Sequence, residues 1–224
     1  MNEIKNLTLG IEEEYQIIDP NSRELTSFIS EFLEKGAMIF KDQVKPELLQ
    51  SQIEIGSNVC DNIEDLEKDL SRLRLLIKKY ANKNGLEFIA AGTHPFSHWK
   101  NQIVTDKSRY HGFMNSTQYV GKRMLIFGMH VHIGIEDKDL RIDVMNQMRY
   151  FIPHIMALAS SSPFWQGGNT GFKSFRSIIF EDLPRTGVPE TFLSYQEYSR
   201  YVETLIRSKS IDDPTKIWWD MRPH

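Results

Sequence analysis

Residues 125–135, LIFGMHVHIGI, are the segment that most restricts how this chain can fold. As a β-strand, the segment has apolar residues at every odd-numbered position, whereas the even-numbered positions from 128 onward are Gly128, His130, His132 and Gly134. The pattern predicts a strand that buries one apolar face and directs two imidazoles to the other. The glycines leave room for a bulky group to approach the backbone. Two histidines separated by one residue are a weak motif, and a solvated outer face also explains them.

Residues 7–18 alternate in the same way and predict a second strand with acidic residues on its polar face. Glu12 and Glu14 share that face, about 7 Å apart along the strand. Two like charges at this separation are costly unless a cation lies between them or both remain in water. The pair therefore indicates either a cation site or a solvated acidic edge. Glu13 interrupts the apolar row, so we expect it to pair with a basic group or to mark where the strand leaves the core.

A third predicted strand, residues 49–59, carries Glu54 on its polar face. Glu47 lies seven residues earlier and would fall on the opposite side of an unbroken strand. It reaches Glu54 only if residues 46–50 turn or bulge. Glu54 is therefore the stronger candidate of the two for a site on the polar face.

Two segments in the last third of the chain add an aspartate and two arginines. SFRSIIF (174–180) is strand-like and carries Arg176, and IWWDMR (217–222) alternates so that Asp220 and Arg222 share a face. As a surface ion pair, Asp220 and Arg222 would contribute little to stability. In a site, they would supply a metal ligand and a clamp for phosphate or carboxylate, and Arg176 would be a second clamp.

Helices are expected between these strands, without a regular βαβ order. Residues 63–84 show helical spacing between a capping Asn62 and a terminating Gly85. Further helices are expected after Asp137 or Asp139, with a kink at Pro153, and over 194–208. Strands that bury one face favour an α+β fold, with a mainly antiparallel sheet and helices packed on one side. Because no linker or repeat is visible, we expect a single catalytic domain over residues 1–224.

The composition limits the kinds of function that this chain can have. A net charge of −3 gives no electrostatic support for binding nucleic acid or an anionic membrane, and no apolar run is long enough to cross a bilayer. The single cysteine, Cys60, is expected to be a small buried residue in a cytoplasmic protein. A metal site must then use oxygen and imidazole ligands, which favours Mg²⁺ or Mn²⁺ over structural zinc.

The polar faces together predict a metal–nucleotide site on the sheet. Carboxylates, a histidine and arginines gathered on one concave face suit Mg²⁺ ions that hold nucleotide phosphates. The glycine-rich stretch 167–174, GGNTGFKS, is not a Walker A loop, because Phe172 stands where a glycine must precede the lysine.

The chain also resembles the glutamate–cysteine ligase type 2 family, the carboxylate–amine ligases of the YbdK type. The matching segments, in the family's order, are LGIEEEYQIIDP, ELLQSQIEIGSNVC, AAGTHPFSHW, FGMHVHIGI, ASSSPFWQGGNTGFKSFRS, PRTGVPETF and WWDMRPH. The resemblance implies a glutamine-synthetase-like fold, in which a curved antiparallel sheet forms a funnel around metal and ATP, with helices outside. It implies ATP-dependent joining of a small-molecule carboxylate to an amine through an acyl phosphate.

The resemblance also implies roles for individual residues. Nucleotide contacts are implied for His132 and Arg222, and stabilisation of the transferring phosphoryl group for Arg222 and Arg176. Glu47 would lie near the amino-acid substrate. The implied ligands of Mg²⁺ or Mn²⁺ are Glu12, Glu14, Glu54, His130 and Asp220.

Family members continue past the RPH segment, so the resemblance also implies a C-terminal truncation, either natural or as a fragment. An uncovered sheet edge would favour association, and a homo-oligomer is one expectation. Two other functions are compatible with the residues. One is a metal-dependent hydrolase, which would need more histidine ligands than the scattered His94, His98 and His111. The other is a truncated chain that binds nucleotide, or a partner subunit, without turnover.

Overall fold

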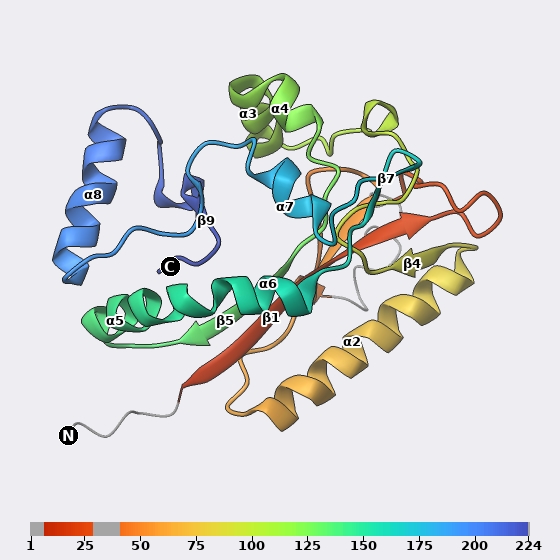
Figure 1. Ribbon diagram of the computed structural model, residues 1–224. Coiled ribbons are helices and arrows are strands. Elements are labelled where there is room, and N and C mark those ends of the chain that lie inside the picture. Colours follow the sequence, from red (N-terminus) through yellow and green to blue (C-terminus); the bar gives the residue numbers. More distant parts are fainter. Residues whose placement is uncertain (1–6, 29–40, 224) are drawn as a thin grey trace. The chain divides into compact units, whose positions relative to one another are not determined.

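Strand β1 (Thr8–Ile18) is the centre of a five-stranded antiparallel sheet in the computed structural model (Figure 1). One edge of β1 pairs with β3 (Gln52–Gly56), whose outer edge pairs with β2 (Val44–Pro46). The other edge of β1 pairs with β5 (Met129–Gly134) along its first half and with β4 (Glu87–Ile89) along its second. The alternating segments at residues 7–18 and 125–135 thus form strands, as their patterns predicted, and the structure shows that the two strands are neighbours.

The structure describes residues 7–28 and 41–223. These residues form a first unit, which contains the sheet, and a second unit, which is mainly helical. The first unit comprises residues 7–28, 41–134 and 161–179, and the second comprises residues 135–160 and 180–223. The mixed content of helix and mainly antiparallel sheet confirms the α+β class. The single catalytic domain over 1–224, and the funnel shape of the sheet, stay predictions.

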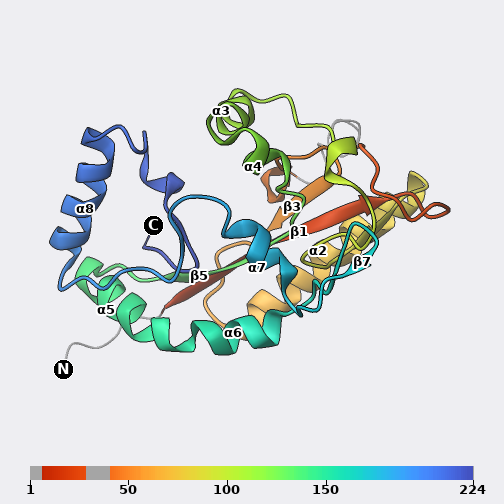
Figure 2. The same ribbon diagram turned by 45° about the horizontal axis from the view of Figure 1, so that its top comes forward.

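Helix α2 (Ile63–Lys83) covers one face of the sheet, as both views of the ribbon show (Figures 1 and 2). The Asn62 side chain accepts a hydrogen bond from the Asp65 backbone N–H, and Gly85 adopts a positive φ of 69° just after the helix. Both ends therefore match the sequence prediction. The core between helix and sheet consists mainly of Tyr15, Ile17, Val44, Ile53, Ile55, Leu73, Ile77, Tyr80, Ala81 and Leu86.

Glu13 points toward α2, away from Glu12 and Glu14. Its carboxylate forms an ion pair with Arg74 of α2 and accepts a hydrogen bond from the Tyr15 hydroxyl. Burial opposes ionisation, but the hydrogen bonds from Arg74 and Tyr15 outweigh it and hold the pKa of Glu13 below its usual value. The predicted pairing with a basic group is confirmed, and it fixes which face of β1 carries Glu12 and Glu14.

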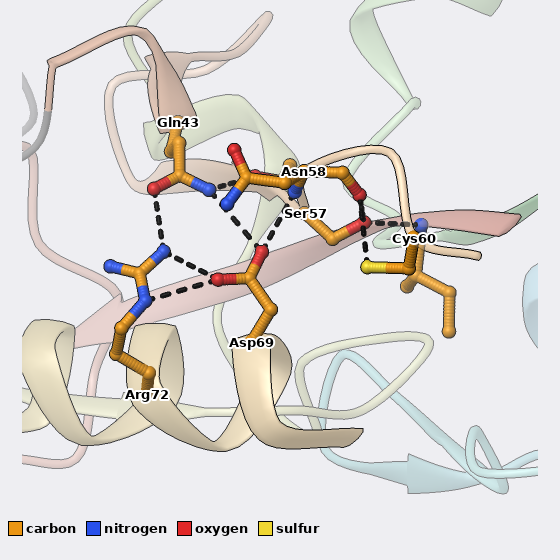
Figure 3. A network of polar contacts seen from close by, with 8 residues as sticks. Gln43, Ser57, Asn58, Cys60, Asp69 and Arg72 are labelled. Carbon is orange, nitrogen blue, oxygen red and sulfur yellow. Dashed lines mark hydrogen bonds and ion pairs between the residues drawn. The ribbon is translucent and has the colours of Figure 1, made fainter. Parts of the chain in front are cut away.

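A polar network ties the segment after β3 to α2 (Figure 3). The Asp69 carboxylate accepts hydrogen bonds from the Asn58 backbone N–H at 2.7 Å and from Arg72 Nε at 3.0 Å. Arg72 also donates to the Gln43 side-chain oxygen at 2.6 Å. Cys60 lies in the same network, buried as predicted, and burial raises the pKa of its thiol. These contacts fix the segment after β3 against α2.

Shorter elements complete the first unit. They are η1 (Lys41–Gln43), η2 (Trp99–Asn101), α3 (Ser108–Thr117), α4 (Tyr119–Lys122), the hairpin of β6 (Phe164–Trp165) and β7 (Gly168–Asn169), and α7 (Phe175–Phe180), whose last residue belongs to the second unit. The SFRSIIF segment is therefore helical, and the strand predicted for it is wrong. A short apolar run fits either structure, and here the Arg176 N–H bonds the Ser162 hydroxyl as the helix begins.

The second unit contains three helices and a two-stranded parallel sheet, and its core consists mainly of Ile142, Met145, Phe192, Tyr198, Val202, Ile211 and Ile217. Its elements are α5 (Lys138–Met148), η3 (Arg149–Phe151), α6 (Ile152–Ala159), β8 (Thr186–Gly187), α8 (Tyr195–Arg207), η4 (Pro214–Lys216) and β9 (Trp218–Trp219). Asp137 caps α5 and Ser194 caps α8, as predicted. The expected kink is a break at η3, after which Pro153 lies in the first turn of α6.

Two details of the strand predictions are wrong. The IWWDMR run forms only the two-residue strand β9, so Asp220 and Arg222 do not share a strand face. In β5, Met129, Val131 and Ile133 are 55%, 59% and 46% exposed, although their row was expected to be buried. Alternation shows which side chains share a face, but it does not show whether another element covers that face. Among the described residues, no helix combines the length and apolar composition needed to cross a membrane.

The exposure of β5 leads to a stability prediction. Val131→Ala should change the free energy of unfolding by about 0.5 kcal/mol or less, because its side chain is already largely in water. Val44→Ala, at a β2 position that is 4% exposed, should cost about 1–3 kcal/mol. Urea unfolding of both variants measures the difference. Equal losses would show that the Val131 face is covered in solution.

Candidate functional site

Polar residues of four strands meet on the face of the sheet opposite α2. Glu14 of β1 lies directly across from Glu54 of β3, and Glu54 lies across from Lys45 of β2. On the other side of β1, Glu12 lies across from His130 of β5. The antiparallel register therefore brings together side chains that lie far apart in the sequence, with 118 residues between Glu12 and His130.

Glu14, Glu47 and Glu54 form a group of three side chains that is suited to metal binding. It is the only such group within residues 7–28 and 41–223. One carboxylate oxygen from each lies within 4.8 Å of the others. Glu47 joins the group because β2 ends at Pro46 and the chain turns before β3, which is the condition that the sequence analysis set for Glu47 to reach Glu54. Its Oε2 accepts a hydrogen bond from the Leu48 backbone N–H at 2.6 Å, which orients the carboxylate.

Burial and mutual repulsion raise the pKa values of two members of this group, Glu47 and Glu54. Burial, followed by the charges of Glu47, Glu12 and Glu14, raises the pKa of Glu54 to about 7. Burial and the Glu14 charge likewise raise the pKa of Glu47. Lys45 Nζ lies 4.0 Å from Glu54 Oε1 and Arg109 Nη2 lies 3.9 Å from Glu47 Oε1, so neither forms a direct hydrogen bond with its carboxylate. A bound divalent cation would neutralise the negative charge of these carboxylates.

Glu12 forms a second cluster with the two histidines. Its Oε2 lies 3.2 Å from His130 Nδ1 and 3.3 Å from His132 Nε2. The hydrogen bond from His130 outweighs burial and, with His132, lowers the pKa of Glu12 to about 2. The same bond raises the pKa of His130. The two imidazoles therefore lie on the polar face, as predicted, and are held by a carboxylate from the neighbouring strand.

Arg176 approaches the site across Gly128. Its Nε donates to the Phe127 carbonyl oxygen at 2.8 Å, and a Cβ atom at Gly128 would lie 3.0 Å from its Nη2 and 3.5 Å from Glu14 Oε1. The Gly128 N–H in turn donates to Glu14 Oε2 at 2.7 Å. The room that the sequence predicted beside the histidines is thus occupied by an arginine, although that arginine comes from a helix.

Asp220 and Arg222 belong to the second unit, so their proposed contacts with metal and nucleotide stay predictions. Within that unit, Arg222 Nη1 donates to the Thr215 and Ile217 carbonyl oxygens. The Asp220 side chain is exposed, and its backbone N–H bonds the Gly187 carbonyl oxygen.

The three scattered histidines have other partners. His94 is 1% exposed, and its two ring nitrogens contact the Arg23 carbonyl oxygen and the Ser97 backbone N–H. His98 Nδ1 accepts from the Lys100 backbone N–H, and His111 lies 2.9 Å from an Asp106 oxygen. The hydrolase alternative is therefore not favoured, since it needs such histidines as further ligands.

Sequence comparison identifies the family. The family model for glutamate–cysteine ligase family 2 (GCS2) matches residues 8–224. The chain belongs to this family. Curated GCS2 relatives carry the name "Putative glutamate--cysteine ligase 2". One from Herpetosiphon aurantiacus is 51% identical over 97% of this chain and 56% of its own length, and one from Solibacter usitatus is 44% identical over 98% and 57%. The chain thus spans just over half the length of these relatives.

Solved structures support the fold of this GCS2 chain. A bifunctional glutathione synthetase from Pasteurella multocida superposes with a TM-score of 0.75 at 15% identity, over 97% of this chain and 32% of that one. A glutamate–cysteine ligase from Francisella tularensis in complex with AMP gives a TM-score of 0.66 at 15% identity, over 95% and 50%. At these identities the likeness concerns the fold alone.

The sequence of this GCS2 chain did not indicate two basic residues that lie beside the carboxylates of the site. Lys45 lies on the three-residue strand β2, which is too short to show alternation. Arg109 of α3 lies 3.9 Å from Glu47 Oε1, and nothing in its local sequence connects it to the strands. The Tyr110 hydroxyl donates to the Pro46 carbonyl oxygen at 3.0 Å and so brings the start of α3 next to Glu47. Only the three-dimensional contact could have identified them.

The raised pKa of Glu54 predicts a pH dependence. A carboxyl with a folded pKa near 7 and an unfolded pKa near 4.5 binds its proton more tightly when folded, so its stabilising effect is lost as pH rises between these values. Without metal, the melting temperature should therefore fall from pH 5 to pH 8, and Glu54→Gln should reduce the fall by roughly 5 °C. Differential scanning calorimetry of both proteins in EDTA measures this, and parallel curves would contradict it.

Proposed function

We propose that this chain carries the catalytic face of an ATP- and Mg²⁺-dependent carboxylate–amine ligase of the glutamate–cysteine ligase type. The observation that carries the proposal is the group of Glu14, Glu47 and Glu54, in which burial and neighbouring carboxylates raise the pKa of Glu54 to about 7. Carboxylate oxygens are the ligands that Mg²⁺ prefers, and membership of GCS2 favours this chemistry over hydrolysis. The funnel-shaped, glutamine-synthetase-like arrangement of the complete site is part of the same proposal.

The proposed reaction has two steps. A carboxylate oxygen of the first substrate attacks the γ-phosphorus of ATP, the bond to the β,γ-bridging oxygen breaks, and ADP leaves. The amine of the second substrate then attacks the carbonyl carbon of the acyl phosphate. The carbon–oxygen bond to phosphate breaks, inorganic phosphate leaves, and the nitrogen loses a proton to form the amide. Both steps need stabilisation of negative charge more than a protein nucleophile.

Different residues of the site would contribute to these two steps. Glu14, Glu47 and Glu54 would hold Mg²⁺, which when bound neutralises charge on the nucleotide phosphates. Glu12 orients His130 and His132 at the edge of the same face, where His130 is a further ligand candidate and His132 a nucleotide contact. We also propose that Arg176 and Arg222 stabilise the transferring phosphoryl group and that Asp220 contacts the metal, as the family resemblance implies.

The test combines binding with turnover. Calorimetry should detect ATP binding in Mg²⁺ or Mn²⁺ but not in excess EDTA, whereas the fold should survive chelation because its apolar cores do not need metal. With glutamate and cysteine present, ADP release should depend on both amino acids. Equal ATP affinity in EDTA would contradict the metal site. Metal-dependent binding without ADP release for any carboxylate–amine pair would favour the nucleotide-binding alternative.

A further inference from the structure

Two glutamine side chains are buried on the face of the sheet that carries the candidate site. Gln16 of β1 and Gln52 of β3 lie directly across from each other and are 0% and 3% exposed. Each lies two residues from a glutamate of the site, Glu14 in β1 and Glu54 in β3, so all four side chains share one face. The polar rows of the two strands therefore continue into the interior as a pair of amides.

Both amides donate to backbone carbonyl oxygens of distant segments. Gln16 Nε2 donates to the Ala91 carbonyl oxygen at 2.9 Å, and Gln52 Nε2 donates to the Ile126 carbonyl oxygen at 2.7 Å. Gln52 Oε1 also accepts from the Leu49 backbone N–H at 3.1 Å. Each glutamine thus fixes one segment that crosses the polar face.

These two segments, residues 91–93 and 126–128, pair with each other and contact Arg176; we call them the supporting segments. They are joined by an antiparallel bridge, and the Phe127 N–H donates to the Gly92 carbonyl oxygen at 3.0 Å. Arg176 Nε donates to the Phe127 carbonyl oxygen at 2.8 Å. A Cβ atom at Gly92 would lie 3.2 Å from the Cβ of Arg176, so this segment also packs closely against the base of the side chain.

The hydrogen bonding of the two glutamines favours a role in geometry over a role in stability alone. Gln16 Oε1 is buried and accepts no hydrogen bond from residues 7–28 or 41–223, and an unpaired buried amide oxygen is costly. An apolar side chain of similar length would fill this space without that cost. Both Nε2 atoms, by contrast, are paired, and both bind the supporting segments. The amides are therefore used where they fix the backbone around Arg176.

We propose that Gln16 and Gln52 are positioning residues, which hold the Arg176 guanidinium in place through the supporting segments. The inference rests on the proposed ligase function and on the part that Arg176 takes in it. A guanidinium lowers the barrier to phosphoryl transfer only if it is in place before the charge develops. Neither glutamine needs to touch a substrate or a metal ion, because both act through backbone carbonyl oxygens.

Gln52→Met and Gln16→Met test the proposal, because methionine removes the amide at nearly constant side-chain length. Each variant should lower kcat for ADP release by about 10- to 100-fold and leave the KM for ATP nearly unchanged. In an Arg176→Met background, either change should add little further loss, whereas general damage to the fold would lower both backgrounds equally. Gln16→Met decides alone if Gln52→Met does not fold, since Gln16 gives up one hydrogen bond and Gln52 gives up two.

NMR of arginine side chains supplies a measurement that needs no turnover. The Arg176 Nε–H signal can be assigned by its absence from Arg176→Met. Its exchange with solvent should be faster by about 10-fold or more in Gln52→Met and Gln16→Met, because the Phe127 carbonyl oxygen that accepts it is no longer held in place.

Gln43→Met is the matched control. Gln43 Nε2 donates to the Gly56 carbonyl oxygen at 3.3 Å and its Oε1 accepts from Arg72 of α2, so this variant loses amide bonds away from the supporting segments (Figure 3). It should leave both kcat and the exchange of the Arg176 signal unchanged.

Three results would overturn the inference. They are a wild-type exchange rate in the variants of Gln16 and Gln52, losses of kcat that add fully to that of Arg176→Met, and an equal effect of Gln43→Met. A wild type that releases no ADP with any carboxylate–amine pair would contradict the proposed function alone. The exchange rates would then still decide whether the two amides hold Arg176.

Discussion

Glu54→Gln should weaken Mg²⁺-dependent nucleotide binding by about 100-fold or more. Glu54 is the most perturbed carboxylate of the group, and its side chain is 15% exposed, so a bound cation would gain most from its charge. Loss of groups that merely support metal ligands typically costs 10- to 100-fold in metal affinity, and a direct ligand should cost at least the upper end of that range. Calorimetric titration of a nucleotide in Mg²⁺ measures the change.

Glu67→Gln is the matched control, because Glu67 is exposed on α2, on the opposite side of the sheet. It should leave nucleotide affinity unchanged. The two variants should also differ without metal, since Glu54→Gln removes repulsion within the group and should not lower the melting temperature. If Glu54→Gln unfolded the protein or bound nucleotide normally, Glu54 would be a structural residue and the metal site would have to lie elsewhere.

The alternation of polar and apolar residues predicted most of the site because a β-strand has a strict two-residue period. Glu12, Glu14 and Glu54 lie on polar faces as expected, and Glu12 meets the histidines because β1 and β5 are paired. The sequence of neither strand shows by itself that β1 pairs with β5. Register depends on which faces are buried together, and that is settled by packing across the whole sheet.

What the sequence did not predict depends on contacts between distant segments. Glu47 reaches Glu14 and Glu54 only because the chain turns after β2, and the residues of this segment permit that turn but do not require it. Arg176 lies on a short helix, although its run is equally compatible with a strand. Arg109 is placed by the Tyr110 hydroxyl bonding to Pro46, a contact across 64 residues of sequence. Local periodicity can assign a side chain to a face, but only tertiary contacts assign it a neighbour.

The placement of Arg176 leads to the prediction with the largest expected effect on catalysis. Arg176→Met should lower the rate of ATP-dependent ligation by about 100- to 1,000-fold, the usual cost of removing one preorganised donor from a developing charge. Metal-dependent nucleotide binding should change much less, because the metal ligands on β1 and β3 stay in place. Steady-state ADP release at saturating substrates measures the rate, and Lys173→Met, at an exposed position three residues away, serves as the control.

Gly128→Ala tests the same role without removing the arginine. The added methyl group would lie 3.0 Å from Arg176 Nη2, so the guanidinium would have to move by a few tenths of an ångström. If Arg176 acts through its position, Gly128→Ala should lower the ligation rate in the same direction, and combining it with Arg176→Met should add little further loss. Additive losses would instead mean that the methyl group disturbs Glu14, whose Oε1 would lie 3.5 Å away, and that Arg176 acts independently of Gly128.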